Sequence, residues 1–474
     1  MGSINRGDTS RALFKNSGII AIGQISTKII NFFLLPLYTA LLSKEEYGIV
    51  DLLSTYSSFL IVIVGLQLNQ AAFRFMVTNR DDSEKTEKII STIFLTALGT
   101  LVVYCVLFFV VQPFLNVEFK WFLLAYVVSG IYLQTCSGMA RGMGDNISYA
   151  IGNFLSATIT LVINVLVIAV LRMGVASMLV SYIVGPIVGG TYILIKCKIL
   201  RFFFVTKAEK RIFCDLMQYA LPLIPNELSW SLIHSSDRMI VSYVLTVAVN
   251  GLVAVASKFS AVYTTIFSIF NTSWTEQVVL HYKDSGGKEY ISDMFDKMVT
   301  FFGTVAVAII ASMPFIFDLL VNEQFKEAYG MIPIYMIAVF FNAIIGMISA
   351  IYLVENETKA VAISTGVAAL INIVVDIALI KFIGVYAAPV SSLCGYAAIS
   401  FWRLFDVNKR HCKIRMKKRN IIYLLIACVI SCISFYMEEM WIHVFVFFPV
   451  SLICIKINRE FLGELKQMFL FWKK

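Results

Sequence analysis

Long apolar stretches recur from one end of the chain to the other, separated by short polar segments. Each is about 20 residues or longer, enough for an α-helix to cross the hydrocarbon core of a bilayer, and we count roughly fourteen of them. The approximate spans are residues 17–42, 49–77, 89–111, 120–140, 149–171, 175–196, 214–245, 250–280, 298–321, 329–354, 360–381, 384–404, 420–437 and 441–457. The pattern predicts an all-α integral membrane protein with about 14 transmembrane helices.

The composition agrees with this prediction and orients the chain. Of the 474 residues, 59% are hydrophobic and only 15% are charged. The net charge of +9 would suit nucleic acid, but Lys and Arg concentrate in alternate loops, at residues 6–15, 80–88, 196–211 and 403–419. This distribution follows the positive-inside rule, so we expect both termini in the cytoplasm and no nucleic-acid partner. An even number of spans requires the same placement of the termini.

The chain contains an internal repeat. Leu42, Gly48, Ser54 and Ser57 match Leu245, Gly251, Ser257 and Ser260 at a constant offset, and later Ile163-Asn164 and Gly174-Val175 match Ile371-Asn372 and Gly384-Val385. Because both copies enter the membrane from the same side, we predict two six-helix lobes related by a pseudo-two-fold axis along the membrane normal. The predicted parts are residues 1–200, residues 201–411, and two extra helices with a cytoplasmic tail in residues 412–474.

The few charges within the apolar spans gather near the start of each half. They are Lys28, Asp51 and Arg74 in the first half, and Glu227, Asp237, Arg238, Lys258 and Glu276 in the second. A charge at bilayer depth costs roughly 2.5–3.5 kcal/mol on insertion scales, so such residues usually mark a transport pathway or a partner. Two structural interpretations stay open. Asp237, Arg238 and Lys258 could form a purely structural ion-pair group, and the Arg74 side chain could extend to the lipid headgroups.

Three acids are candidates for ion coupling. Asp376 has Asn372 one turn away and no basic neighbour on its own helix, while Glu227 and Asp237 are also acids at spanning depth. A carboxyl there can exchange a proton or bind a cation, so we expect coupling to H⁺ or Na⁺. The sequence has no phosphate-binding glycine loop with a lysine, so we expect no nucleotide cofactor and secondary transport.

Several motifs, taken together in order and spacing, resemble one known family. They are Leu37-Tyr38 through Ser43 to Glu46-Tyr47-Gly48, Leu221-Pro222 with Ser236-Asp237-Arg238-Met239-Ile240, Gly251 with Ala256-Ser257-Lys258, and Asn372 and Asp376 with Gly384, Ala387-Ala388 and Ser391. Over nearly its whole length the chain resembles the lipid-linked oligosaccharide flippases of the polysaccharide transporter family. That family belongs to the multidrug/oligosaccharidyl-lipid/polysaccharide exporter superfamily.

The resemblance implies a function as well as a fold. It implies two lobes facing a central cavity, and alternating access that moves a polyprenyl-pyrophosphate-linked oligosaccharide from the inner to the outer leaflet of the bacterial plasma membrane. Lys28, Arg74, Arg238 and Lys258 would then bind the pyrophosphate, which prefers charge-assisted donors. The implied partners are this lipid-linked substrate, membrane lipids, and polysaccharide polymerase and chain-length proteins. The protein would be a transporter rather than an enzyme.

Three other interpretations stay open. A drug or cation antiporter of the same superfamily would have an acidic or apolar cavity, which Lys28, Arg238 and Lys258 speak against. A membrane-embedded polysaccharide polymerase would carry a large external loop with catalytic Arg or acids, and none is visible in the sequence. A purely structural membrane protein would not need the charged spans.

Overall fold

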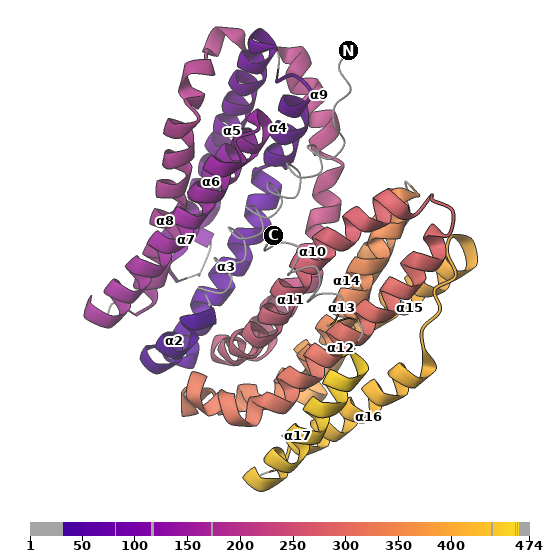
Figure 1. Ribbon diagram of the computed structural model, residues 1–474. Coiled ribbons are helices and arrows are strands. Elements are labelled where there is room, and N and C mark those ends of the chain that lie inside the picture. Colours follow the sequence, from indigo (N-terminus) through magenta and orange to yellow (C-terminus); the bar gives the residue numbers. More distant parts are fainter. Residues whose placement is uncertain are drawn as a thin grey trace. The chain divides into compact units, whose positions relative to one another are not determined.

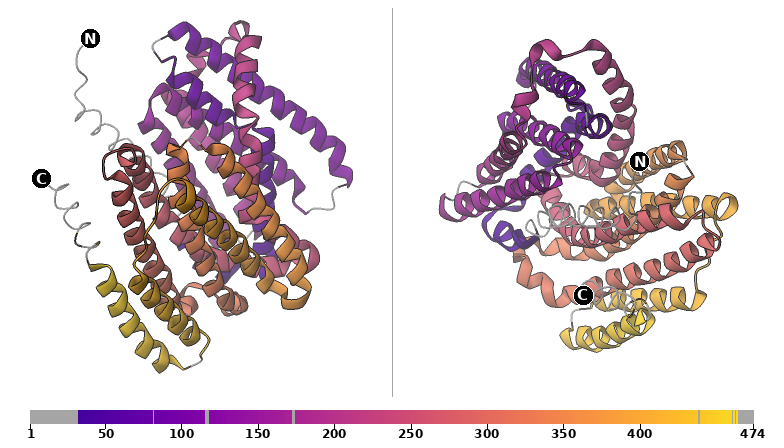
Figure 2. Two further views of the ribbon diagram at one scale, coloured as in Figure 1. Left: turned by 90° about the vertical axis from the view of Figure 1, so that its right-hand side faces the viewer. Right: turned by 45° about the horizontal axis from the view of Figure 1, so that its top comes forward.

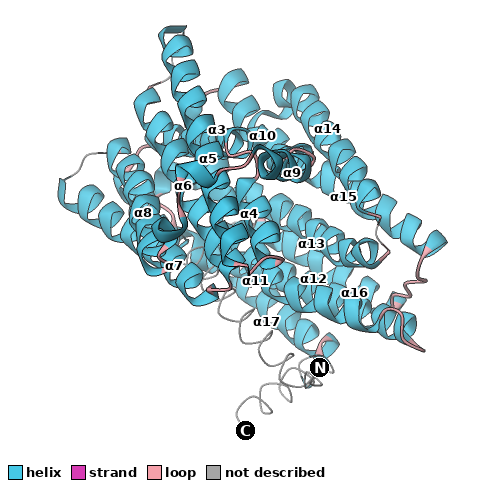
Figure 3. Ribbon diagram, turned by 90° about the horizontal axis from the view of Figure 1, so that it is seen from above, coloured by secondary structure: helices cyan, strands magenta, loops and turns pink. Residues whose placement is uncertain are grey.

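The computed structural model describes residues 32–80, 82–114, 118–171, 174–355, 357–437, 439–459, 461 and 463. These residues form helices joined by short loops, and no strand occurs among them (Figure 3). Within them, 11 stretches are long and apolar enough to cross a membrane, and one of these, Lys359–Arg410, contains two helices. The predicted all-α, multi-pass membrane protein is confirmed.

Internal packing divides the chain into two units, Met1–Ser231 and Leu232–Lys474. The predicted lobe boundaries at residues 200 and 411 stay a prediction, because they concern the repeat rather than this division. The α-helices of the first unit are α2 (Leu35–Leu41), α3 (Lys44–Val64), α4 (Leu68–Val77), α5 (Ser83–Val111), α6 (Lys120–Met143), α7 (Asn146–Leu166), α8 (Val175–Lys196) and α9 (Lys210–Ala220) (Figure 1). Helix α10 (Leu223–Val244) runs across the division.

The second unit continues with longer helices. They are α11 (Val247–His281), α12 (Gly287–Leu320), α13 (Ile332–Val354), α14 (Thr358–Ile383), α15 (Ala387–Arg410), α16 (Lys418–Phe435) and α17 (Met440–Ile457). Helices α14 and α15 pack against each other and α15 also packs against α13, while α16 and α17, yellow in Figure 2, pack side by side against α12. The two extra C-terminal helices therefore belong to the second unit.

Two predicted spans are each divided into two helices. The span predicted over 49–77 breaks after Val64, where Leu66 and Gln67 adopt left-handed backbone conformations with φ of 47° and 53°. Non-glycine residues rarely take positive φ, so the hydrophobic pattern gave no sign of this break. The span predicted over 214–245 breaks near Pro222, which has no backbone N–H to continue the helix.

Local geometry supports the internal repeat. Ser43 caps the start of α3 and Thr246 caps the start of α11, each accepting a hydrogen bond from a backbone N–H three residues on, and their numbers differ by the predicted offset. Gly174 before α8 has φ 56° and ψ −132°, and Gly384 after α14 has φ 58° and ψ −132°. Only glycine adopts such angles without strain, so each unit keeps the same turn at the matched position.

Candidate functional site

A buried polar cluster lies within the second unit, where α10, α13, α14 and α15 meet. Ser236 on α10 donates to the Asn372 side chain on α14 at 2.9 Å, and the Tyr335 hydroxyl on α13 donates to Asp237 at 3.2 Å. The Asn372 amide donates in turn to two serine hydroxyls of α15, Ser391 and Ser392, at 3.3 and 3.4 Å. We call Ser236, Asp237, Tyr335, Asn372 and Asp376 the polar cluster.

Asp376 is the exceptional member of the polar cluster. Its side chain is 0% exposed, and neither carboxylate oxygen has a hydrogen-bond partner among the described residues. It lies within electrostatic reach of Asp237 and Tyr335. A buried carboxylate without a donor is unfavourable, so this position suits a neutral, protonated carboxyl or a carboxylate with a bound cation. Asp376 is therefore well placed for the predicted exchange.

The predicted basic residues of the second unit lie beside this cluster. Arg238 follows Asp237 on α10, and its guanidinium donates to the Ser257 hydroxyl on α11 at 2.8 Å. Ser257 immediately precedes Lys258, whose side chain is half-buried, as is that of Arg238. Arg238 thus follows an acid of the cluster along α10, and its contact with Ser257 joins it to the helix that carries Lys258, so basic and acidic residues both occur in this region.

The remaining predicted site residues do not join the cluster. Arg74 lies in the first unit on α4, with an exposed side chain whose guanidinium stacks 4.4 Å from the Tyr219 ring centroid. Glu227 lies on α10 ten residues before Asp237, nearly three helical turns away. Lys28 lies outside the described residues. The roles predicted for all these residues stay predictions.

Sequence analysis missed the two tyrosines that complete the site. Tyr335 donates to Asp237, and the Tyr396 hydroxyl on α15 lies 2.7 Å from the Nδ1 atom of His234. Both tyrosines are buried. Nothing in the local pattern distinguishes them from the chain's other tyrosines, because their partners are distant in sequence.

Arg403 was misjudged as the start of the basic loop at 403–419. It lies inside α15, is 0% exposed, and donates to the hydroxyls of Ser349, Ser364 and Thr365 and to the Val361 carbonyl at 2.8 to 3.0 Å. These partners lie on α13 and α14. A planar guanidinium with five N–H donors suits such a set of acceptors, so Arg403 fastens three helices together.

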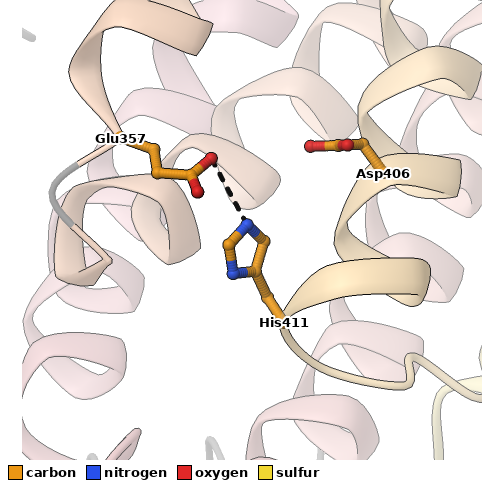
Figure 4. Close-up of side chains that lie close together, drawn as sticks. All are labelled: Glu357, Asp406 and His411. Carbon is orange, nitrogen blue, oxygen red and sulfur yellow. Dashed lines mark ion pairs between the residues drawn. The ribbon is translucent and has the colours of Figure 1, made fainter.

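Three potential metal ligands, Glu357, Asp406 and His411, gather at the end of α15 (Figure 4). Arg410 pairs with both acids, and His411 lies 3.4 Å from Glu357. The Tyr352 hydroxyl also donates to Asp406 at 2.6 Å. The guanidinium already supplies the positive charge that a metal would bring, so we interpret this group as an ion-pair network.

Comparison with solved structures identifies the class of fold. The chain is similar to a lipid II flippase, MurJ, in an inward closed conformation, with a TM-score of 0.72 at 14% identity over 94% of this chain and 99% of that one. It is also similar to an inward-facing multidrug resistance MATE family transporter of the MOP superfamily, with a TM-score of 0.60 at 12% identity over 82% and 95% of the two chains. The fold is thus one of membrane transport proteins.

The family follows from the sequence match. The model described as polysaccharide biosynthesis protein matches residues 13–275, more than half of the chain, and the chain belongs to that family. The chain is also similar to Lsg locus putative protein 1 of Haemophilus influenzae. The two are 30% identical over 120 residues, and this match covers 22% of this chain and only 29% of that relative. The family is thus one of polysaccharide biosynthesis proteins, and the fold is the one seen in the flippase and the MATE transporter.

Arg403 yields a test of packing. Arg403→Lys replaces a guanidinium group, which has five N–H donors, by a single ammonium group that cannot contact all of the same acceptors. We expect a loss of roughly 3 kcal/mol in unfolding free energy, on the scale of one or two hydrogen bonds to a charged group. Thermal unfolding of the purified protein in detergent measures this. The matched control is Arg410→Lys on the same helix, where the ion pairs are partly exposed and the change is small. Equal effects of the two variants would contradict the role of Arg403.

Proposed function

We propose that the protein is a flippase that moves a polyprenyl-pyrophosphate-linked oligosaccharide from the inner to the outer leaflet of the bacterial plasma membrane by alternating access. The observation that carries the proposal is the pairing of Arg238 with Ser257, which brings the Arg238 guanidinium to the helix of Lys258. Family membership, with its link to polysaccharide biosynthesis, points to a glycan substrate.

Two cations at this depth suit a pyrophosphate. Each pyrophosphate oxygen accepts charge-assisted hydrogen bonds, and guanidinium groups bind two oxygens at once. The nearby buried tyrosines offer flat apolar faces with a hydroxyl, which suit sugar rings. The lipid chain of the substrate can stay in the membrane, so only the charged and sugar parts need to enter the protein. Lys28 and Arg74 would extend the path.

The energy source in this proposal is an ion gradient. Asp376, with Asp237 and Glu227 as further acids, would take up and release H⁺ or Na⁺ as the protein changes its facing. Asp237 already accepts a hydrogen bond from Tyr335, so Asp376 is the stronger candidate. The polymerase and chain-length proteins that use the exported glycan would be partners on the outer side.

An antiporter for cationic drugs is the second candidate function. The buried carboxylate of Asp376 favours it, because a cationic drug would bind to such an acid. The two functions differ in the charge of the transported group, so substrate tests separate them.

The anion site can be tested by substitution. Arg238→Ala or Lys258→Ala should lower glycan export about tenfold or more at normal protein level, because one charge-assisted hydrogen bond is worth roughly 1.5–3 kcal/mol. Arg238→Lys should recover part of the activity. The control is Lys326→Ala, an exposed cation outside the cluster. Export that survives Ala at Lys28, Arg238 and Lys258 together would contradict the assignment. Efflux of cationic dyes without glycan export would favour the antiporter.

Ion coupling can be tested at Asp376. Asp376→Asn mimics a permanently protonated carboxyl, so flipping by the reconstituted protein should no longer respond to a proton or sodium gradient. The control is Asp318→Asn, an exposed acid on α12, which should leave the response intact. A wild-type flipping rate that ignores both gradients would show an uncoupled facilitator. A gradient response retained by Asp376→Asn would move the coupling site elsewhere.

The proposed orientation, with both termini in the cytoplasm, has its own test. Native Cys412 is a poor probe because it is buried and burial raises the pKa of its thiol. Single cysteines can instead be placed at exposed Lys85 and Lys326, with exposed Cys214 changed to Ser. In intact cells an impermeant thiol reagent should label Lys326→Cys only, and Lys85→Cys should need permeabilisation. The opposite labelling pattern would show that the orientation in the membrane is the reverse of the proposed one.

A further inference from the structure

A long apolar groove of about 920 Å³ lies within the first unit. One wall is α5, from Thr92 to Val111, and the other includes Leu60 and Ile63 of α3. From Thr92 to Val111 there are 19 steps of about 1.5 Å along the helix axis, so the groove is about 28 Å long. The groove lies where α3 ends and the chain breaks at Leu66, which is itself one of the lining residues.

The length of the groove indicates its occupant. The hydrocarbon core of a bilayer is roughly 30 Å thick, so the acyl chains of one leaflet would fill about half of a groove 28 Å long. A polyprenyl chain is longer than one leaflet and can fill it entirely. Apolar chains gain stabilisation in proportion to the surface that they bury against shape-matched walls.

One end of the groove is suited to a phosphate. Ala208, Glu209 and Lys210 line this end, where α9 begins. No side chain caps the start of α9, so its first backbone N–H groups and the positive end of its dipole are open to an anion. Lys210 is exposed, and the described residues show no ion pair for it.

The other charges at this end are already neutralised by one another. Lys88 lies 2.8 Å from Glu209 and 3.1 Å from Glu84, and Lys207 pairs with Glu87. Lys210, which lines the groove, is therefore available to a phosphate at its mouth.

Tyr104 supplies a further observation inside the groove. It is only 7% exposed, and its hydroxyl has no hydrogen-bond partner among the described residues. Leaving a buried hydroxyl unpaired costs about 1–3 kcal/mol. An isoprenoid chain carries double bonds whose π electrons can accept a weak hydrogen bond, whereas a saturated chain has none.

We propose that this groove binds the polyprenyl chain of the lipid-linked substrate when the substrate is loaded, with its phosphate held at Lys210 and the N-terminus of α9 before the pyrophosphate moves to Arg238 and Lys258. The inference rests on the proposed function, because it assigns the lipid part of the same substrate. It adds a second contact on a different set of helices from the polar cluster. The groove then selects the carrier lipid by length and unsaturation, while the polar cluster selects the charge.

Binding can be measured with purified protein and a photoreactive long-chain polyprenyl phosphate. Gly99 lines the groove, and a Cβ there meets no atom within 4 Å, so Gly99→Phe fills the groove without a clash in the helix bundle. We expect crosslinking to fall about tenfold, because the Phe side chain takes the place of the apolar contact that the polyprenyl chain would make. The control is Leu98→Phe, an exposed neighbour that does not line the groove.

A second pair of variants keeps the test valid if one of the first variants misfolds. Val103→Phe changes a lining residue and should weaken crosslinking, whereas Val102→Phe changes an exposed neighbour outside the groove and should not. Lys210→Gln should weaken binding of the phosphate, and Lys198→Gln, another exposed lysine of the same loop region, should leave it unchanged. Thermal unfolding confirms that each variant is folded.

The outcomes separate this inference from the proposed function. Two results together support binding of the polyprenyl chain in the groove. Crosslinking falls only in the variants of lining residues, and farnesyl phosphate and phosphatidylglycerol compete only weakly. Equal crosslinking in lining and control variants, or equal competition by phosphatidylglycerol, overturns it. If wild-type protein binds the polyprenyl phosphate in the groove but flips no linked oligosaccharide in vesicles, the proposed function fails and the groove stands. If the wild-type protein flips the linked oligosaccharide, and the Gly99→Phe variant flips it and binds the polyprenyl phosphate equally well, the groove assignment is wrong and the proposed function stands.

Discussion

A polar group inside a membrane protein must find its partners within the protein, because lipid offers none. Arg403 shows how this constraint shapes the second unit. Its guanidinium is buried and donates to oxygen atoms on α13 and α14, so these helices and α15 cannot separate without exposing a charge to hydrocarbon. Gly395 on α15 allows the close approach, since a Cβ there would meet the Ala368 carbonyl at 3.2 Å. The polar cluster forms on this fixed three-helix base.

The two units share local architecture but use it differently. At the repeat offset, the broken pair α3 and α4 corresponds to the single long helix α11. In the second unit the unbroken helix presents Ser257 to Arg238 and carries Lys258 as its next residue. In the first unit the helix is interrupted at Leu66 and Gln67, and an apolar groove lies beside this break. A duplicated fold can thus carry a different kind of site in each half, a charged one in the second unit and an apolar one in the first.

Sequence patterns predicted the all-α membrane fold because bilayer thickness fixes the length of a spanning helix. They also found Asn372 and Asp376, whose spacing puts them on one helix face. They could not find Tyr335, because its role depends on Asp237, far away in sequence. Arg403 was misassigned since a charge beside a basic loop looks like part of that loop. The left-handed backbone conformation at Leu66 and Gln67 could not be predicted from the sequence, because neither residue is glycine.

Arg403 and Asp376 are two buried charged residues with opposite surroundings. Arg403 is surrounded by acceptors, so the cost of its burial is offset and its charge state is fixed. Asp376 is equally buried, yet neither of its oxygens has a hydrogen-bond donor among the described residues. Such a carboxyl stabilises the fold less than an apolar side chain of similar size would. Its free energy instead depends strongly on whether a proton or cation is bound. A group whose occupancy changes the energy of one conformation can bias the equilibrium between two conformations, and this is the physical requirement for coupling.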